Sequence, residues 1–388
     1  MVEMNSRSTN ALTIGFDVSQ TCETRAGCGW YADALIRAMV TTAPENHYAI
    51  YHRFGYRQAL DPMLGTQISH PHVNMPFIGI GEKESLKIWN AVAAGARDLP
   101  GEPDIVQSNS FQAPPVGKAK LVVVIHDVSF WANPEFSTEG NRICCQTGVF
   151  EALKRADGII FVSNSSHEEF ERMLPSWLCN NQVPFAVIHE AGRLQPEGDP
   201  IPGSSGSYWL AVGSLEPRKN YENLLTGFQI YWDKSSQRVP LHLAGGDGWM
   251  NDALLARFAE LENFGMVRRL GYVPDENLVS TYQSARALLF PSWYEGFGLP
   301  VLEGMQCGCP VICSTRTSMA EIGGEAIIAI DPANPESIAK AMLRIEEESG
   351  LRDKLIGAGK IQADYFGWDK AARATLEFYK TVMKNRRL

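Results

Sequence analysis

Two adjacent cations, Arg218 and Lys219, follow directly after the apolar stretch YWLAVGS at 208–214. An arginine offers a planar pair of donors to a phosphate, and a lysine offers a compact point charge. A helical pattern begins at 220, and cations at the start of a helix oppose its dipole. A purely structural role is therefore slightly unfavourable, and the pair indicates a phosphate-binding site.

Two glutamates, Glu295 and Glu303, lie eight positions apart in the otherwise apolar, glycine- and proline-containing stretch PSWYEGFGLPVLEGMQCGCPVIC. Pro300 suits the first turn of a helix, so the amides of Gly298, Leu299 and the residues after Pro300 would be available to a diphosphate. Glu303 would fall in the first helical turn, close to the bound group. Glu295 lies in the preceding loop among aromatic residues, where a carboxylate needs a partner such as the hydroxyl groups of a sugar.

The first half of the chain carries two further candidate sites. In FDVSQTCETRAGCGWYADAL, Gly27 and Gly29 stand just before a predicted helix, as in a phosphate-binding loop. The pattern is not GxGxxG, and no acidic residue stands at the expected end of a second strand, which disfavours a dinucleotide-dependent dehydrogenase. His126 and Asp127 end the most apolar strand of this half. That position indicates a catalytic or ligand-binding role for the histidine.

These candidates need strands that bring them to one edge of a sheet. Short β-rich runs alternate with amphipathic helical patterns such as 220–232 and 252–264, which is typical of parallel sheets with helices on both faces. Several runs are continuously apolar, as strands buried on both faces should be. The predicted strands are 12–18, 48–52, 104–108, 121–127, 158–163 and 185–190, then 208–214, 241–246, 267–273, 286–292, 310–314 and 326–331.

The alternation is interrupted near the middle of the chain. GRLQPEGDPIPGSSGS at 192–207 is rich in proline, glycine and serine and holds little that could pack, so it predicts a linker. We therefore expect a first domain at 1–192, a linker at 193–207 and a second domain at 208–367. Because ligands of doubly wound sheets bind at the carboxyl ends of the strands, the expected site is the cleft between two facing domains.

Composition excludes several classes of protein. The chain has 388 residues, of which 45% are hydrophobic and 20% charged, and its net charge is −9. Nucleic-acid-binding domains are usually basic, so that class is disfavoured. No apolar run approaches the roughly 18 residues of a membrane helix, and the N-terminus has no signal core, so we expect a cytoplasmic protein. The eight cysteines form no CxxC pair, which argues against a zinc site.

Several motifs together resemble the retaining glycosyltransferases of family 4, which have the GT-B fold. They are GSLEPRKN, LAGGDGW, HDVSF, GCGWY and the long stretch from LGYVPDENL to CGCPVI, in which EGFGLPVLE has the glutamate–seven–glutamate pattern of the family. FGWDKAARATLEFY resembles the helix of that family that crosses back to the first domain, here placed at 368–388. The resemblance implies an α/β protein with two doubly wound, Rossmann-like domains that face each other across a cleft.

The resemblance also implies roles for individual residues. His126 would lie beside the donor sugar near its reacting carbon, and Arg218 and Lys219 would neutralise the leaving diphosphate. Glu295 would hold hydroxyl groups of the transferred sugar, and Glu303 would bind the nucleotide ribose. The further donor-binding residues would be Gly27, Gly29, Asp127, Gly213, Gly245, Tyr272, Val273, Gly296, Phe297, Gly298 and Leu299. Among these, the backbone near Tyr272 and Val273 would contact the base.

The implied reaction moves a hexose from a nucleoside-diphosphate sugar to a hydroxyl group, with retention at the anomeric carbon. No carboxylate pair suits a double displacement, so the leaving diphosphate would take the proton of the acceptor on the same face. The sequence has no DxD motif, so Arg218 and Lys219 would replace a metal, and neither a metal nor a cofactor is expected. Family frequency alone places UDP-glucose first and GDP-mannose second as the donor.

The expected acceptor is a saccharide or a lipid-linked saccharide in the synthesis of a polysaccharide or glycoconjugate. Tryptophans in IWNAV and LPSWL look exposed, which indicates peripheral contact with the inner face of a membrane. Two other classes stay open: a non-hydrolysing sugar-nucleotide epimerase, which needs acid–base residues beyond His126, and a non-catalytic nucleotide-binding module. The intact set of Arg218, Lys219, Glu295 and Glu303 argues against the module.

Overall fold

The computed structural model describes residues 11–22, 27–55, 61–194, 196, 206–246, 248 and 252–385. Residues 1–10, where no signal core is expected, most of the predicted linker, and Asp247 and Trp249 of LAGGDGW lie outside this described part, as do the last three residues of the predicted C-terminal helix. The chain forms two compact units, Met1–Glu190 with Trp368–Leu388 and Ala191–Gly367.

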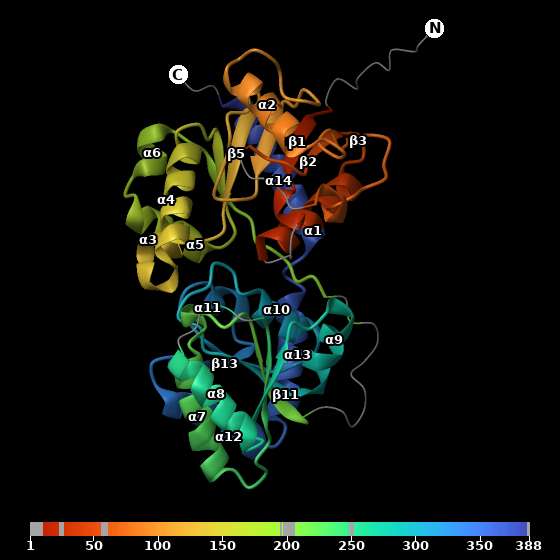
Figure 1. Cartoon of the computed structure of the whole chain (residues 1–388). Coiled ribbons are helices and arrows are strands. Elements are labelled where there is room, and N and C mark those ends of the chain that lie inside the picture. Colours follow the sequence, from red (N-terminus) through yellow and green to blue (C-terminus); the bar gives the residue numbers. More distant parts are fainter. Residues whose placement is uncertain are drawn as a thin grey trace. The chain divides into compact units, whose positions relative to one another are not determined.

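The first unit is built on a seven-stranded sheet in the order β3-β2-β1-β4-β5-β6-β7. Every neighbouring pair of strands is parallel, and helices flank the sheet (Figure 1). The strands are β1 (Thr13–Asp17), β2 (His47–Tyr51), β3 (Val73–Asn74), β4 (Ile105–Ser108), β5 (Lys120–Ile125), β6 (Gly158–Phe161) and β7 (Phe185–Val187). The helices are α1 (Gly27–Thr42), α2 (Glu82–Ala93), α3 (Ser129–Ala132), α4 (Glu139–Leu153), α5 (Asn164–Met173), α6 (Trp177–Asn181) and α14 (Trp368–Lys384), with short 3-10 turns at Ser19–Thr21, Pro62–Leu64 and Pro134–Phe136.

The tryptophans predicted to face a membrane belong to the core of this unit. Trp89 on α2 is 1% exposed and stacks on Phe77, with the ring centroids 5.7 Å apart. Trp177 at the start of α6 is half-buried and packs against the same core. The prediction that these side chains are exposed was therefore wrong, because the apolar face of each helix packs inward. Among the described helices, none is both long and apolar enough to cross a membrane.

The C-terminal helix α14 returns to the first unit, as the sequence predicted, and packs beside α1 (Figure 1). The Tyr379 hydroxyl donates to Gln107 Oε1 at the end of β4, at 2.6 Å. Gly158 at the start of β6 lets the helix approach closely, because a Cβ there would lie 2.6 Å from Val382. The helix thus supports the sheet whose strand ends carry candidate residues.

The second unit is built on a six-stranded parallel sheet in the order β10-β9-β8-β11-β12-β13. Its strands are β8 (Tyr208–Val212), β9 (Leu241–Ala244), β10 (Val267–Gly271), β11 (Ala285–Phe290), β12 (Val311–Ser314) and β13 (Ile327–Ile330). Its helices are η4 (Pro217–Lys219), α7 (Tyr221–Lys234), α8 (Asp252–Asn263), α9 (Asp275–Ser284), α10 (Leu299–Gln306), α11 (Ser318–Gly323), α12 (Pro335–Glu347) and α13 (Leu351–Ala363).

Both sheets have the doubly wound order in which the chain reverses direction across the sheet after its third strand. The reversal places a crevice beyond the carboxyl ends of β1 and β4 in the first unit, and of β8 and β11 in the second. The predicted α/β class and parallel sheets are confirmed. The added strand β3 is two residues long and lies in a stretch interpreted from sequence as an exposed turn around His70 and His72.

Candidate active site

Three charged residues meet at the strand reversal of the second unit. Arg218 and Lys219 end the short helix η4 after β8, and Glu295 follows β11, the neighbouring strand. Lys219 Nζ lies 2.7 Å from Glu295 Oε1, and Arg218 NH1 lies 2.6 Å from Oε2. The side chains that the sequence assigned separately to a diphosphate and to a sugar thus form one cluster. We name Arg218, Lys219 and Glu295 the charged cluster.

The charged cluster is buried and internally balanced. Glu295 and Lys219 are 6% and 7% exposed, and Arg218 also pairs with Glu216 at 2.7 Å. Burial alone would raise the pKa of Glu295, but Arg218 and Lys219 lower it below its usual value. Burial lowers the pKa of Lys219 although Glu295 opposes that change. Of the two cations, Arg218 keeps the more accessible side chain, at 28% exposed, and is the better placed to meet a ligand.

Two glycines make room for the charged cluster. Gly213 after β8 has φ +142°, a conformation that favours glycine, and a Cβ there would lie 3.0 Å from Lys219 Cε. Gly245 after β9 packs directly on the Gly213 carbonyl, which leaves no space for a side chain. These predicted donor-binding residues therefore have a steric role beside Lys219. They also line a cavity of about 180 Å³ at the ends of β8, β9 and β10, together with Gly271.

The predicted base-contacting residues follow that cavity in the chain. Tyr272 is 61% exposed and Val273 is half-buried, just after Gly271, which has φ +67°. An exposed aromatic ring beside a cavity at the strand ends is available for stacking on a flat ligand.

The loop before α10 is fixed by its backbone. The Thr317 hydroxyl accepts a hydrogen bond from the Glu295 amide at 3.1 Å, and the Ser318 hydroxyl donates to the Glu295 carbonyl at 2.9 Å. Phe297 is 5% exposed and packs edge-on against Phe366, so its side chain serves the core rather than a ligand.

The N-terminus of α10 has the features of an anion-binding site. Gly298 precedes the helix with φ +104° and provides no side-chain cap, while Leu299 and Pro300 open the first turn. The first amides of a helix have no intrahelical acceptor, so this end suits an anion. Gly296, Gly298 and Leu299 thus remain candidates through their backbone.

Glu303 is more deeply placed than the sequence suggested. It is the fifth residue of α10 and lies beyond the first turn, so it does not complement the helix dipole as predicted. It is 2% exposed, accepts from Arg193 Nε at 2.8 Å and accepts from the Tyr282 hydroxyl at 3.0 Å. Each carboxylate oxygen keeps a further lone pair, so a ribose hydroxyl could join these partners.

Arg193 is a site residue that sequence reasoning missed. It stands in the segment interpreted as a linker, yet it pairs with Glu303 and, at 3.2 Å, with Asp275 on α9. Burial alone would lower the pKa of Arg193, but these two carboxylates raise it. Leu194 beside it is 4% exposed. The linker assignment was therefore wrong for its first residues, because the side chains of Arg193 and Leu194 are held by the second unit.

His126 follows β5 directly and is held on several sides within the first unit. Its Nδ1 lies 3.1 Å from Glu190 Oε1, and its carbonyl accepts from the Ser166 hydroxyl at 2.8 Å. Tyr31 on α1 packs edge-on against the imidazole, with the ring centroids 4.9 Å apart. Burial alone would lower the pKa of His126, but Cys28 and Glu190 raise it well above its usual value. Glu190 was missed by sequence reasoning, which placed it inside a predicted strand.

The remaining first-unit candidates have mainly local roles. Asp127 Oδ1 accepts from the Ser129 amide at 2.9 Å and from its hydroxyl at 2.7 Å, which stabilises the start of α3. Gly27 and Gly29 form part of the first turn of α1 and do not precede the helix as predicted. Gly27 is exposed with open space around it, whereas Gly29 is buried.

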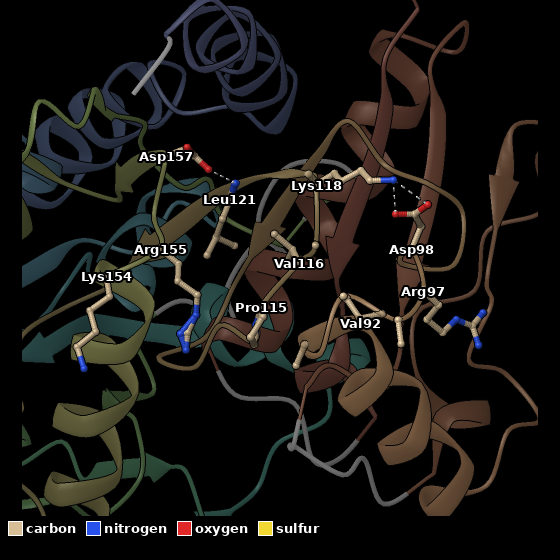
Figure 2. Close-up of a pocket in the computed structure, with 15 residues that line it drawn as sticks. Val92, Arg97, Asp98, Pro115, Val116, Lys118, Leu121, Lys154, Arg155 and Asp157 are labelled. Carbon is tan, nitrogen blue, oxygen red and sulfur yellow. Dashed lines mark hydrogen bonds and ion pairs between the residues drawn. The ribbon is translucent and has the colours of Figure 1, made fainter. Parts of the chain in front are cut away.

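Another cavity of the first unit, of about 720 Å³, lies away from these residues (Figure 2). It is lined at the amino-terminal ends of β5 and β6, where Lys118 pairs with Asp98 at 3.0 Å and Asp157 accepts from the Leu121 amide at 2.9 Å. His126 follows the opposite, carboxyl end of β5. Within the described ranges, no group of three or more histidine, cysteine or acidic side chains is arranged to hold a metal ion.

The comparisons with known proteins agree with the site. The family model described as glycosyl transferases group 1 matches residues 203–362. The O-antigen chain mannosyltransferase B of Escherichia coli is 33% identical over 277 residues, which cover 68% of this chain and 71% of that protein. The serotype-specific mannosyltransferase WbdA of Escherichia coli is 27% identical over 281 residues, and the match spans only 34% of its length.

Solved structures share the fold. Sucrose-phosphate synthase from Thermosynechococcus elongatus is similar with a TM-score of 0.67 at 20% identity, covering 96% of this chain and 99% of that one. Anabaena Alr3699/HepE in complex with UDP and glucose is similar with a TM-score of 0.67 at 16% identity, covering 95% of this chain and 100% of that one.

Proposed function

Because the chain belongs to the glycosyl transferases of group 1, we propose that it moves a mannosyl group from GDP-mannose to a hydroxyl group of a growing polysaccharide, with retention at the anomeric carbon. The observation that carries the reaction class is the charged cluster at the strand reversal of the second unit, next to the N-terminus of α10. Together they offer two cations and a helix end to one diphosphate.

The choice of sugar depends on the relatives. Family frequency favoured UDP-glucose, but the relative at 33% identity is named an O-antigen chain mannosyltransferase. WbdA, at 27% identity, is also named a mannosyltransferase. These names support mannose over glucose and a polysaccharide acceptor of the O-antigen kind.

Residue roles follow from the contacts. Arg218 and Lys219 would stabilise the charge that grows on the departing diphosphate, which is where preorganised cations contribute most to catalysis. Glu295, anchored between them, would accept hydrogen bonds from mannose hydroxyls through its remaining lone pairs. Glu303 would bind the ribose, and the backbone near Tyr272 and Val273 would contact the base. His126 would lie beside the sugar.

The chemical step needs no covalent enzyme intermediate. The bond between the anomeric carbon and the diphosphate oxygen breaks, and the acceptor oxygen bonds to that carbon on the same face. The acceptor proton passes to the leaving diphosphate. The protein then contributes orientation and electrostatic stabilisation, with Arg218 and Lys219 supplying the positive charge that a metal could otherwise supply.

Turnover with defined donors tests the proposal. The full chain would be incubated with radiolabelled GDP-mannose or UDP-glucose and an octyl α-mannobioside, with Arg218→Ala/Lys219→Ala as the inactive control. We expect an α-mannosylated product from GDP-mannose only, with the configuration determined by NMR of the new anomeric centre. Transfer from UDP-glucose alone would overturn the donor, and a β-linked product would overturn retention. Isomer exchange would identify an epimerase, and binding without a product from any donor would identify a nucleotide-binding module.

A further inference from the structure

We propose that Glu190 is a positioning residue that holds the imidazole of His126 in one orientation and tautomer, with Nε2 presented to an oxygen of the bound sugar donor. The proposal rests on the transferase function proposed above, and it adds a residue to which neither the motifs nor the family resemblance assigns a role. It is carried by the contacts on the two sides of one buried ring.

The first side of the ring is fixed by a carboxylate. Nδ1 of His126 and Oε1 of Glu190 are 3.1 Å apart, and the two side chains are 10% and 5% exposed. A carboxylate only accepts hydrogen bonds, so the proton of this contact must be on Nδ1. The partner of one ring nitrogen sets the role of the other. Glu190 therefore decides what Nε2 can offer to a ligand.

The second side of the ring lacks a partner. Nε2 is buried and has no hydrogen-bond partner within the described part of the chain. A buried polar atom without a partner is costly, and a bound substrate would satisfy it. The ring cannot easily turn away, because Tyr31 packs edge-on against it and Ser166 holds its backbone carbonyl.

Charge around the ring favours the imidazolium form. The titratable groups that face it are Cys28 and Tyr31 from α1 and Glu190 after β7, while the neighbouring Asp127 is bonded to Ser129. Burial opposes protonation, but Cys28 and Glu190 raise the pKa of His126 well above its usual value. Thiols are ordinarily neutral near pH 7 whereas carboxylates are charged, so Glu190 supplies the lasting negative charge. Nε2 then carries a proton and donates to a substrate oxygen.

The sign of the pH dependence follows from that protonation. His126 holds its proton below its raised pKa and loses it as the pH rises through that value, so activity should fall on the alkaline side. Glu190→Gln removes the charge and keeps the size of the side chain. We expect the titration midpoint of His126 to fall by about one pH unit or more, and kcat to fall about tenfold to a hundredfold, the scale of a lost hydrogen bond to a charged group. The KM for GDP-mannose should change much less.

Two measurements on the full chain test this expectation. Imidazole ¹⁵N NMR follows the titration of His126, whose signals are assigned by their loss in His126→Asn, and initial rates with GDP-mannose give kcat across the pH range. The alkaline limb of kcat should move to lower pH in Glu190→Gln together with the NMR midpoint. The matched control is Glu169→Gln, which breaks an exposed pair with Arg172 on α5 and should change neither quantity.

The outcomes separate the positioning role from its rivals. An unchanged His126 midpoint and pH profile in Glu190→Gln would overturn the proposal, as would a midpoint that falls in Cys28→Ser but not in Glu190→Gln. If Glu190→Gln does not fold, Glu190→Asp keeps the charge on a shorter side chain and should lower kcat. Wild-type behaviour of that variant, or failure of both variants to fold, would also overturn the positioning role.

The NMR titration needs no turnover. If the wild-type chain transfers no mannose, the proposed function fails, while the midpoint still decides whether Glu190 controls His126. If transfer occurs and the midpoint does not respond to Glu190, only the positioning role fails.

Discussion

Replacing Glu303 with glutamine should destabilise the second unit strongly, although the change adds no bulk. Glu303 is 2% exposed, and its oxygens accept from Arg193 Nε at 2.8 Å and from the Tyr282 hydroxyl at 3.0 Å. The glutamine can keep one of these contacts, but its amide group then faces a guanidinium with no charge to balance it. Breaking a buried ion pair costs about 3–5 kcal/mol.

The lower end of that range applies here, because Arg193 keeps its second carboxylate, Asp275, at 3.2 Å. We therefore expect Glu303→Gln to lose about 3 kcal/mol, or roughly 6–12 °C in Tm for a unit of this size. Urea unfolding followed by tryptophan fluorescence measures the change. Tyr282→Phe is the matched control, since it removes one neutral donor and should cost about 1 kcal/mol.

A paired replacement separates stability from binding. Apolar side chains of similar volume often replace a buried ion pair without loss, so Arg193→Met combined with Glu303→Leu should recover most of the stability of the single variant. The same double variant should still bind GDP about tenfold or more weakly, because the proposed ribose contact is gone. Isothermal titration gives the affinity. A loss below about 1 kcal/mol in Glu303→Gln, outside the range expected for a broken buried pair, would refute this reasoning.

Three further predictions concern the charged cluster. Arg218→Ala should lower kcat on the order of 100-fold with a smaller effect on the KM for GDP-mannose, because charge grows on the diphosphate as the bond breaks; steady-state rates that change only in KM would contradict this. Glu295→Gln should bind GDP at least as tightly as wild type, since the two cations lose a competitor, but should bind or transfer GDP-mannose roughly tenfold less well; titrations that show equal weakening of both ligands would count against the sugar contact. Activity should survive EDTA, and a loss restored by magnesium or manganese would disprove the cation assignment.

The charged cluster could be predicted from sequence because parallel sheets constrain where strand ends lie. Lys219 and Glu295 are 76 positions apart in the chain, but each follows a strand with a strong apolar signal. The strands β8 and β11 are neighbours, and the carboxyl ends of parallel strands share one edge of the sheet. Apolar periodicity and residue type thus sufficed to place these two residues in one region, although not to show that they contact each other.

The partners Glu190 and Arg193 could not be predicted in this way. Glu190 ends the predicted strand at 185–190, but β7 stops at Val187, and only the tertiary structure brings the carboxylate to His126. Arg193 lies in a stretch rich in proline and glycine, whose average composition concealed one arginine with two carboxylate partners. Trp89 shows the same limit, since a short amphipathic helix does not reveal from its sequence which face the unit covers.

Two charged side chains stand three positions apart where the chain leaves the first unit and enters the second, and both are largely buried. Glu190 is 4% exposed, and the side chain of Arg193 is 19% exposed. A buried ion pair is seldom more stable than an apolar pair of the same volume, so stability alone does not account for charges at these positions. Each charge instead contacts a residue that the sequence assigned to the donor site, Glu190 contacting His126 and Arg193 contacting Glu303. Orientation of those two side chains gives a physical reason for placing buried charges beside a stretch whose composition is that of a linker.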